Sequence, residues 1–226
     1  MTVNYGAFIV NTGLVVCLDA INSRSYTGSG TTWYDLSGNS TDAILTNSPT
    51  YGSGSFTFNG TSQYASMTRT ISDDFSLLCW FKTSSSAGSG SGQWWAGNGL
   101  VDGEVAGTAN DFVLSIGAGK LLFGVGNTDT TIVSTSTYND NIWHCVVATR
   151  VKSSGAMTLY VDGYSVATGT GQTGSLTGPT NITIGVLQTI VNYFTGSIGS
   201  VLIYNKALTG AEVLQNFNAY RGRYNV

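Results

Sequence analysis

The sequence contains few of the residues that usually carry chemistry. Among its 226 residues are one histidine, two prolines and three cysteines, and charged side chains make up 9% of the total, against roughly 25% in an average soluble domain. The nine basic residues are scattered from Arg24 to Arg223, and the net charge is −3. Nothing forms the basic stripe that would neutralise phosphates, so we expect no nucleic-acid partner.

Long apolar runs and paired cysteines are missing too. No segment approaches the roughly 20 apolar residues that cross a bilayer, so we expect no membrane insertion. The stretch from Met1 to Gly13 has no basic region before an apolar core, which argues against a secretory signal. Cys17, Cys79 and Cys145 lie in separate apolar runs without CxxC spacing. This pattern favours three buried thiols over a disulfide or metal set, as in a protein made in a reducing cytosol.

What the sequence has in abundance is short apolar segments separated by Gly, Asn and Ser. Hydrophobic residues make up 42% and there are 30 glycines, a composition typical of sheets and turns. A single helix is predicted over Gly210–Ala219, where Thr209 and Glu212 form a capping box and Val213, Leu214 and Phe217 an apolar stripe. We therefore predict an all-β, antiparallel two-sheet sandwich with one short C-terminal helix. Its strands are predicted over 14–19, 55–59, 64–68, 75–82, 112–116, 120–125, 131–134, 143–150, 158–161, 181–185 and 199–204.

Several motifs in a fixed order suggest a family. Trp143–Arg150 followed by Met157–Gly163 reads as a β-hairpin with its turn at Lys152–Gly155, and Phe194–Tyr204 runs into Asn205–Leu208. Together with Phe56–Tyr64, these segments resemble the laminin-G-like branch of the concanavalin A-like lectin/glucanase superfamily. The resemblance implies a jelly roll over residues 13–226, preceded by an N-terminal segment, 1–12. The opening Gly13–Asn39 is similar to laminin-G-like structural proteins of tailed bacteriophages, those of marine and cyanobacterial phages (cyanophages) especially.

Catalysis is tested against the glucanases of the same superfamily. Retaining glycosidases need two carboxyl groups about 5 to 5.5 Å apart, and the superfamily's hydrolases usually supply them from a Glu-x-Asp-x-Glu-like strand. This chain has no such strand and only two glutamates, Glu104 and Glu212, of which Glu212 serves the helix cap. The only histidine, His144, is followed by Cys145, which would project from the opposite sheet face and leave no local nucleophile–base pair. We predict a non-enzymatic protein.

A calcium site is the cofactor that the sequence favours. Asp102, Glu104, Asn110 and Asp111 fall within ten residues, and loops rich in oxygen ligands suit Ca²⁺. Laminin-G-like domains often hold calcium at a loop rim. The alternative is that these side chains satisfy turns. A second oxygen-rich stretch, Asp35–Asp42, is a weaker candidate, because Asp35 and Asn39 suit a tight turn unaided.

Sugar binding requires an exposed aromatic face with polar partners nearby. Trp94 and Trp95 follow the Gly/Ser-rich stretch 84–92, and Trp33 and Tyr34 form a second pair. Neighbours on a strand point oppositely, so one member of each pair is expected to face solvent. Asn127 and Asp129 complete the candidate set as amide and carboxylate partners. Core packing is the alternative explanation for each tryptophan.

The leading hypothesis is a virion structural protein, made in the host cytoplasm and displayed on the exterior surface of a phage as decoration, fibre or adhesion module. It would bind host surface glycans weakly through many copies, assemble with other capsid or tail proteins and form a homo-oligomer. The segment Asn4–Val10 (with Tyr5, Phe8, Ile9 and Val10) is apolar enough to dock on a partner as an arm, and the alternative is an edge strand. The alternatives are a purely structural cementing protein without ligand, and a bacterial carbohydrate-binding module or glycosidase-related domain.

Overall fold

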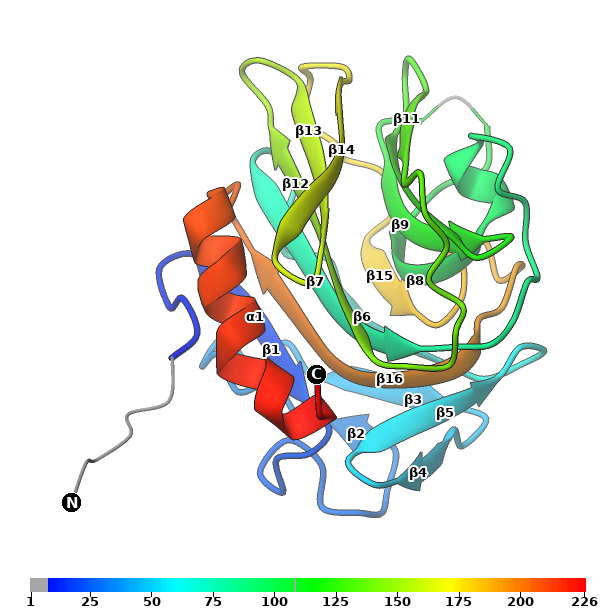
Figure 1. The fold of residues 1–226 in the computed structure, drawn as a ribbon, viewed down its shortest axis with the longest axis vertical. Helices are drawn as coiled ribbons and strands as arrows, with labels where there is room; N and C mark the ends of the chain where they lie inside the picture. Colours follow the sequence, from blue (N-terminus) through cyan, green and yellow to red (C-terminus); the bar gives the residue numbers. More distant parts are fainter. Residues whose placement is uncertain (1–7, 108) are drawn as a thin grey trace.

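The computed structural model describes residues 8–107 and 109–226, and these form two antiparallel sheets packed face to face (Figure 1). Each sheet has eight strands. In the first sheet the order is β14 (Tyr164–Thr170), β13 (Ala156–Val161), β12 (His144–Val151), β7 (Phe75–Lys82), β16 (Thr195–Tyr204), β5 (Ser55–Asn59) and β4 (Thr50–Gly52), with β1 (Leu14–Asp19) paired to β16. In the second it is β11 (Thr130–Val133), β10 (Lys120–Val125), β9 (Phe112–Gly117), β8 (Asn98–Gly103), β15 (Asn181–Ile184), β6 (Tyr64–Thr68), β3 (Ala43–Thr46) and β2 (Thr32–Trp33). The predicted jelly-roll sandwich is confirmed.

Strand β7 shows how the apolar pattern builds two cores. Its odd-numbered residues, including Leu77 and Cys79, face the core between the sheets, whereas Leu78 and Trp80 belong to a second cluster on the outer face of the first sheet. Side chains alternate along a strand, so both faces of β7 are covered and the sequence reads as one continuous apolar run.

Helix α1 (Gly210–Tyr224) covers that outer face (Figure 1). Thr209 accepts the backbone N–H of Glu212 and the Glu212 carboxylate accepts that of Thr209, as the predicted capping box requires. The helix extends to Tyr224 rather than ending at Ala219, because its last turn is held on Trp80. The Tyr224 ring stacks on the Trp80 indole with centroids 4.3 Å apart.

Part of the predicted apolar stripe was wrong. Val213 and Phe217 are buried, and Phe217 stacks on Trp80 at 5.7 Å, but Leu214 is exposed. Leu214 lies against Gly163 at the margin of the helix contact, where only part of its side chain is covered. The buried face of the helix is therefore shifted away from Leu214 and includes Asn216, Tyr220 and Tyr224, which the sequence did not predict.

The β12–β13 hairpin is confirmed, with Val151 paired to Ala156 across its turn. The strands that the sequence did not predict are β2, β3, β4, β8 and β14, together with the short 3₁₀ helix η1 (Trp94–Ala96). Most of these strands are short or glycine-containing, or exposed on one side, so they lack a strong apolar alternation.

The oxygen-rich stretch after Trp33 seals the outer edge of β1. Asp35 Oδ1 accepts the Cys17 N–H at 2.7 Å, the Leu36 N–H donates to the Cys17 carbonyl at 2.9 Å, and the Ser37 hydroxyl donates to the Val15 carbonyl at 3.1 Å. Backbone groups on an open sheet edge otherwise invite another strand. Asp35 therefore serves the fold through hydrogen bonds that explain its place in the sequence.

The described part of the N-terminal segment docks on the chain's own helix. The Val10 N–H donates to Asn216 Oδ1 at 2.8 Å, and its carbonyl accepts the Tyr204 hydroxyl at 2.9 Å. Val10 is thus used within the chain, whereas Tyr5 of the proposed docking arm lies outside the described residues. In the part of the chain that the structure covers, no helix has the length and apolarity to cross a membrane.

Candidate functional site

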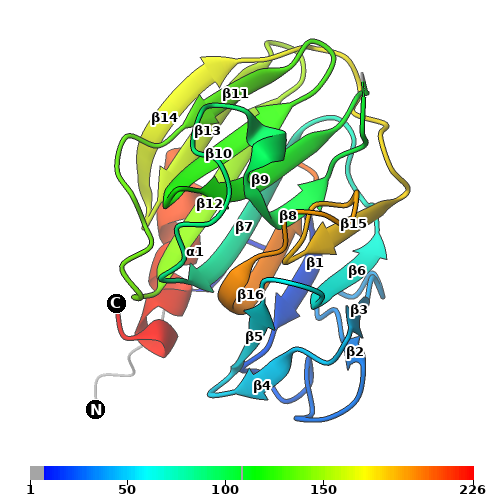
Figure 2. The ribbon, with the colours of Figure 1, turned by 90° about the vertical axis from the view of Figure 1, so that its right-hand side faces the viewer.

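The short helix η1 lies against the outer face of the second sheet, on the opposite side of the molecule from α1 (Figure 2). The Trp94 carbonyl accepts the Ser115 hydroxyl of β9 at 2.9 Å. The Trp94 indole packs so closely on Gly124 of β10 that a Cβ there would collide with the ring. Trp94 is therefore a buried anchor, and Trp95 next to it is only half-buried, with the two rings edge to face at 5.2 Å.

Acidic residues at the end of β8 and just after it hold the neighbouring loops in place, and Asp102 lies within the strand rather than in the predicted loop. Asp102 is fully buried, and its Oδ1 accepts the N–H groups of Glu104 at 2.8 Å and Gln188 at 2.7 Å. Glu104 Oε2 accepts the Thr189 hydroxyl at 2.7 Å, and Asp111 Oδ2 accepts the Val105 N–H at 2.8 Å. The loop 186–193 is thereby fixed beside the tryptophans.

These elements enclose a pocket of about 280 Å³. That is near the lower end of the range for ligand sites, which starts at about 300 Å³, and it suits one small ring. The tryptophans and the acidic residues, which the sequence predicted as a sugar site and a separate calcium site, lie together in this pocket. We call this the tryptophan pocket, and its lining residues are Trp94, Trp95, Glu104, Val105, Gly107 and Asp129.

Burial dominates the electrostatics of the acidic side chains. It raises the pKa of Asp111 to about 7, with further repulsion from Glu104 and Asp129. Burial also raises the pKa of Glu104, against the hydrogen bond from Thr189, and raises the pKa of Asp102 well above the ordinary range. Burial disfavours the charged form of a carboxyl group, so these three side chains lose their protons less readily than carboxyl groups in water.

The predicted calcium ligands do not converge into a ready-made site. In residues 8–107 and 109–226, no group of three or more His, Cys, Asp or Glu side chains is arranged to hold a metal. Asn110 Oδ1 accepts the Asn127 amide at 3.2 Å, and the carboxylates serve backbone N–H groups and Thr189. One oxygen each of Asp102 and Asp111 is buried without a partner. Calcium binding at Asp102, Glu104, Asn110 and Asp111 therefore stays a prediction.

The second aromatic pair lies elsewhere. The prediction that Trp33 stacks on a sugar was wrong. Its ring is fully buried in the main core, with its centroid 4.9 Å from that of the Phe56 ring. Tyr34, which directly follows β2, is exposed as expected, but it lines neither the tryptophan pocket nor the larger pocket between β1 and α1. Asn127 is exposed on the turn that also carries Asp129, yet only Asp129 lines the tryptophan pocket.

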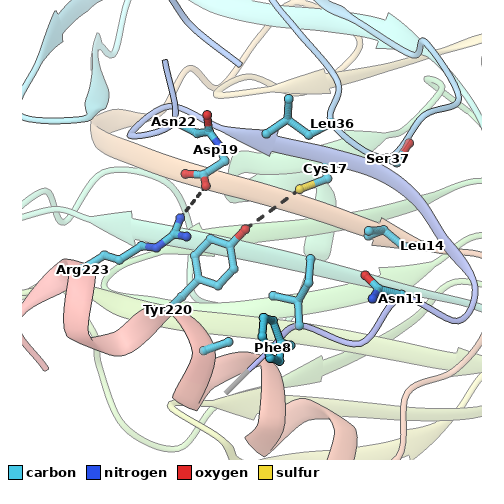
Figure 3. A pocket seen from close by; sticks show the side chains of 12 residues that line it. Phe8, Asn11, Leu14, Cys17, Asp19, Asn22, Leu36, Ser37, Tyr220 and Arg223 are labelled. Atoms are coloured by element: carbon cyan, nitrogen blue, oxygen red, sulfur yellow. Dashed lines mark hydrogen bonds and ion pairs between the residues drawn. The ribbon is translucent and has the colours of Figure 1, made fainter. Parts of the chain in front are cut away.

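A larger pocket of about 470 Å³ lies between β1 and α1 (Figure 3). Its charged groups already satisfy one another, since the Arg223 guanidinium pairs with the buried Asp19 carboxylate at 2.5 Å. The Tyr220 hydroxyl lies 4.0 Å from the Cys17 sulfur, and Arg223 covers the Tyr220 ring at 4.5 Å (Figure 3). The exposed Phe8 ring also lines this pocket, but the carboxylate and guanidinium there are already paired with each other, so the pocket meets the polar needs of a sugar less well.

Sequence reasoning missed the loop 186–193. Besides Gln188 and Thr189, it contributes Asn192, whose amide donates to the Trp95 carbonyl at 3.1 Å. These residues are some 90 positions from the tryptophans, and no linear motif joins them. Only the pairing of β15 with β8 brings the loop to the pocket.

Two stacked antiparallel sheets with one helix on the outside define a lectin-like β-sandwich. A family model described as the concanavalin A-like lectin/glucanases superfamily matches residues 58–214, and the chain belongs to that superfamily. Comparison with curated proteins found no match.

Solved structures with the same fold include binding domains of botulinum neurotoxins. The binding domain of botulinum neurotoxin DC in complex with rat synaptotagmin II superposes with a TM-score of 0.70 at 16% identity, over 93% of this chain and 52% of that one. A botulinum neurotoxin type C structure, from work on cell entry dependent on two ganglioside molecules, gives 0.71 at 15% identity, over 92% and 52%. The chain spans about half the length of these structures, and at such identity the likeness shows the fold alone.

Proposed function

We propose that this chain is a non-enzymatic carbohydrate-binding module and that the tryptophan pocket holds the sugar. The observation that carries the proposal is the half-buried Trp95 ring at a pocket sized for one ring, with Glu104 and Asp129 as hydrogen-bond acceptors. A sugar offers an apolar face to an aromatic ring and hydroxyl donors to carboxylates. Trp94 beneath fixes the geometry of the site.

A glycan array with wild-type protein and with Trp95→Ala tests this proposal. Because one aromatic contact contributes about 1 kcal/mol, we expect Trp95→Ala to weaken the binding of every bound glycan about fivefold to tenfold. Tyr164→Ala, which removes an aromatic ring exposed on the first sheet, is the matched control and should bind normally. An array that binds no glycan, or a Trp95→Ala protein that binds as well as wild type, contradicts the proposal. A parallel array with EDTA tests whether calcium takes part.

Hydrolysis is the one competing function that an observation favours. Glu104, whose pKa burial raises, lines the same pocket as the exposed Asp129, and a glycosidase needs two carboxyl groups, one of them an acid of raised pKa. The Glu104 side chain is nevertheless only 8% exposed and accepts a hydrogen bond from Thr189. Both observations favour a structural role for Glu104 in lining the pocket over a catalytic one. Release of reducing sugar by wild type but not by Glu104→Gln would replace the binding proposal with an enzyme.

We also propose that the module is displayed on the exterior of a virion, on capsid or tail proteins and as a homo-oligomer. The support is the resemblance of Gly13–Asn39 to phage structural proteins. Many copies would compensate for a weak single site through effective concentration. A density map of the particle that places this chain on its outer surface supports display, and light scattering on the purified chain gives its oligomeric state. A chain at an outer position that binds no glycan would be a cementing protein.

A further inference from the structure

The tryptophan pocket carries negative charge without a compensating cation. Two of its lining side chains, Glu104 and Asp129, are acidic, and none is Lys or Arg. Behind the wall, Asp111 feels the charges of both. A pocket of this kind therefore discriminates between ligands by their charge.

The basic residues of the chain are elsewhere. The one on a neighbouring strand, Lys120, begins β10, whereas Asp129 follows the far end of that strand. Six residues of extended strand separate their ends by roughly 17 Å, which exceeds the Debye length of about 10 Å at ordinary ionic strength. Lys120 therefore does little to offset the pocket's charge.

The aromatic ring in the pocket also favours a cation. Trp95 presents an indole ring beside the two carboxylates, and an ammonium group near an indole face is attracted to its negative quadrupole. A carboxylate-bearing sugar would instead meet the exposed Asp129 carboxylate as a like charge. Charge repulsion of this kind is an effective way to reject a ligand of the wrong class.

We infer that the tryptophan pocket selects sugars that carry a free ammonium group, that is hexosamines, over N-acetylated and sialylated sugars. This inference rests on the proposed function and adds the ligand class to it. The ammonium group would lie between Asp129 and the Trp95 ring, where an ion pair and a cation–π contact act together. The rest of the sugar ring would occupy the pocket as any neutral sugar would.

Calorimetric titration with three probes tests the selectivity, in buffer freed of divalent cations at about pH 6.5, where a primary amine is protonated. The probes are a glucosamine tetramer, an N-acetylglucosamine tetramer and a sialylated oligosaccharide. At about 50 mM salt we expect the glucosamine tetramer to bind about threefold to tenfold more tightly than the N-acetylated one, and the sialylated probe most weakly. At about 500 mM salt the advantage should shrink, because salt screens exposed charges.

The Asp129→Asn variant locates the effect. It should remove most of the advantage of the glucosamine tetramer over the N-acetylated one, because the amide oxygen of the variant can still accept a hydroxyl hydrogen bond but carries no charge to pair with the ammonium group. The readout is therefore the ratio of the two affinities, which a general weakening of sugar binding would leave unchanged. Asp42→Asn is the control: it makes the same change of charge at the other end of the second sheet, and its amide oxygen can still accept the Asp35 N–H. This control protein should keep the full preference.

The outcomes separate the two proposals. If the two tetramers bind equally, or the sialylated probe binds best, the ammonium selectivity is wrong while sugar binding stands. If Asp129→Asn keeps the preference, or free ethanolamine competes as strongly as the glucosamine tetramer, the inference also fails. If neither tetramer, nor any glycan on the array, binds, the proposed function itself fails.

Discussion

The His144 imidazole lies between two carboxylates at the start of β12. Its Nδ1 lies 2.8 Å from Asp162 Oδ2 and its Nε2 lies 3.2 Å from Asp140 Oδ1. The rings of Tyr138 and Phe81 lie 5.1 and 6.1 Å away. Burial lowers the pKa of His144, but the hydrogen bond and charge of Asp162, with the charge of Asp140, outweigh it and raise the pKa overall. The residue joins the β13–β14 turn to the segment before β12.

The contacts of His144 with Asp162 and Asp140 predict that the free energy of unfolding depends on pH. A histidine whose pKa is higher in the folded protein than in the unfolded chain, where it is about 6.5, stabilises the fold fully below that pH. The contribution is lost as the pH rises through the folded-state pKa. We expect the difference in unfolding free energy between wild type and His144→Gln to be largest near pH 5 and to shrink toward alkaline pH. Urea unfolding from pH 5 to alkaline pH measures this difference in free energy. A difference that stays constant with pH would refute a stabilising role for the charged form of His144.

The aromatic residues show what a sequence can predict at this scale. Alternation along a strand correctly predicts that Trp33 and Tyr34 differ in exposure, but it cannot say which one is buried. For Trp94 and Trp95 the contrast also holds, although they lie on a 3₁₀ helix rather than a strand. Its cause is the close approach of the Trp94 ring to Gly124, a contact between distant positions that no local pattern encodes.

Helix α1 is the element whose packing is easiest to test. Phe217 is buried against Trp80, whereas Leu214, one turn earlier, is exposed. Truncating a buried aromatic costs about 3 to 5 kcal/mol, and truncating an exposed side chain usually less than about 1 kcal/mol. We expect Phe217→Ala to lower the free energy of unfolding by the larger amount and Leu214→Ala by the smaller. Equal losses in chemical denaturation would mean that the helix docks through a different face.

Strong elements were predictable and weak ones were not. The bounds of β1, β5, β6, β7 and β10 follow from apolar runs between turn residues, because burial on one or both faces selects those residues. By contrast, β4 and β14 have half-exposed or exposed side chains throughout, and their strand state depends on hydrogen bonds to a neighbour. Such pairing is a tertiary effect, so the local sequence does not predict these two strands.

For the whole molecule, the fold was predictable and the site only in its parts. The order of apolar segments and turns is enough to specify two stacked sheets. The sequence predicted functional roles for both the acidic residues and the tryptophans, but it assigned them to two separate sites, one for calcium and one for a sugar. Their meeting in one pocket depends on the loop 186–193, whose residues match no motif. A ligand site on a sandwich is made by loops from distant positions, and this explains the gap.

The three thiols give the molecule one further property. Cys17, Cys79 and Cys145 are free and buried, and burial raises the pKa of Cys17 to about 11. Thiolate is the reactive form, so these sulfurs should neither cross-link nor oxidise readily. We expect the same melting temperature with dithiothreitol, with oxidised glutathione and with neither, and a shift of several degrees under either reagent would contradict this. A protein of this kind matures without any oxidation step, and its architecture is indifferent to the redox state of its surroundings.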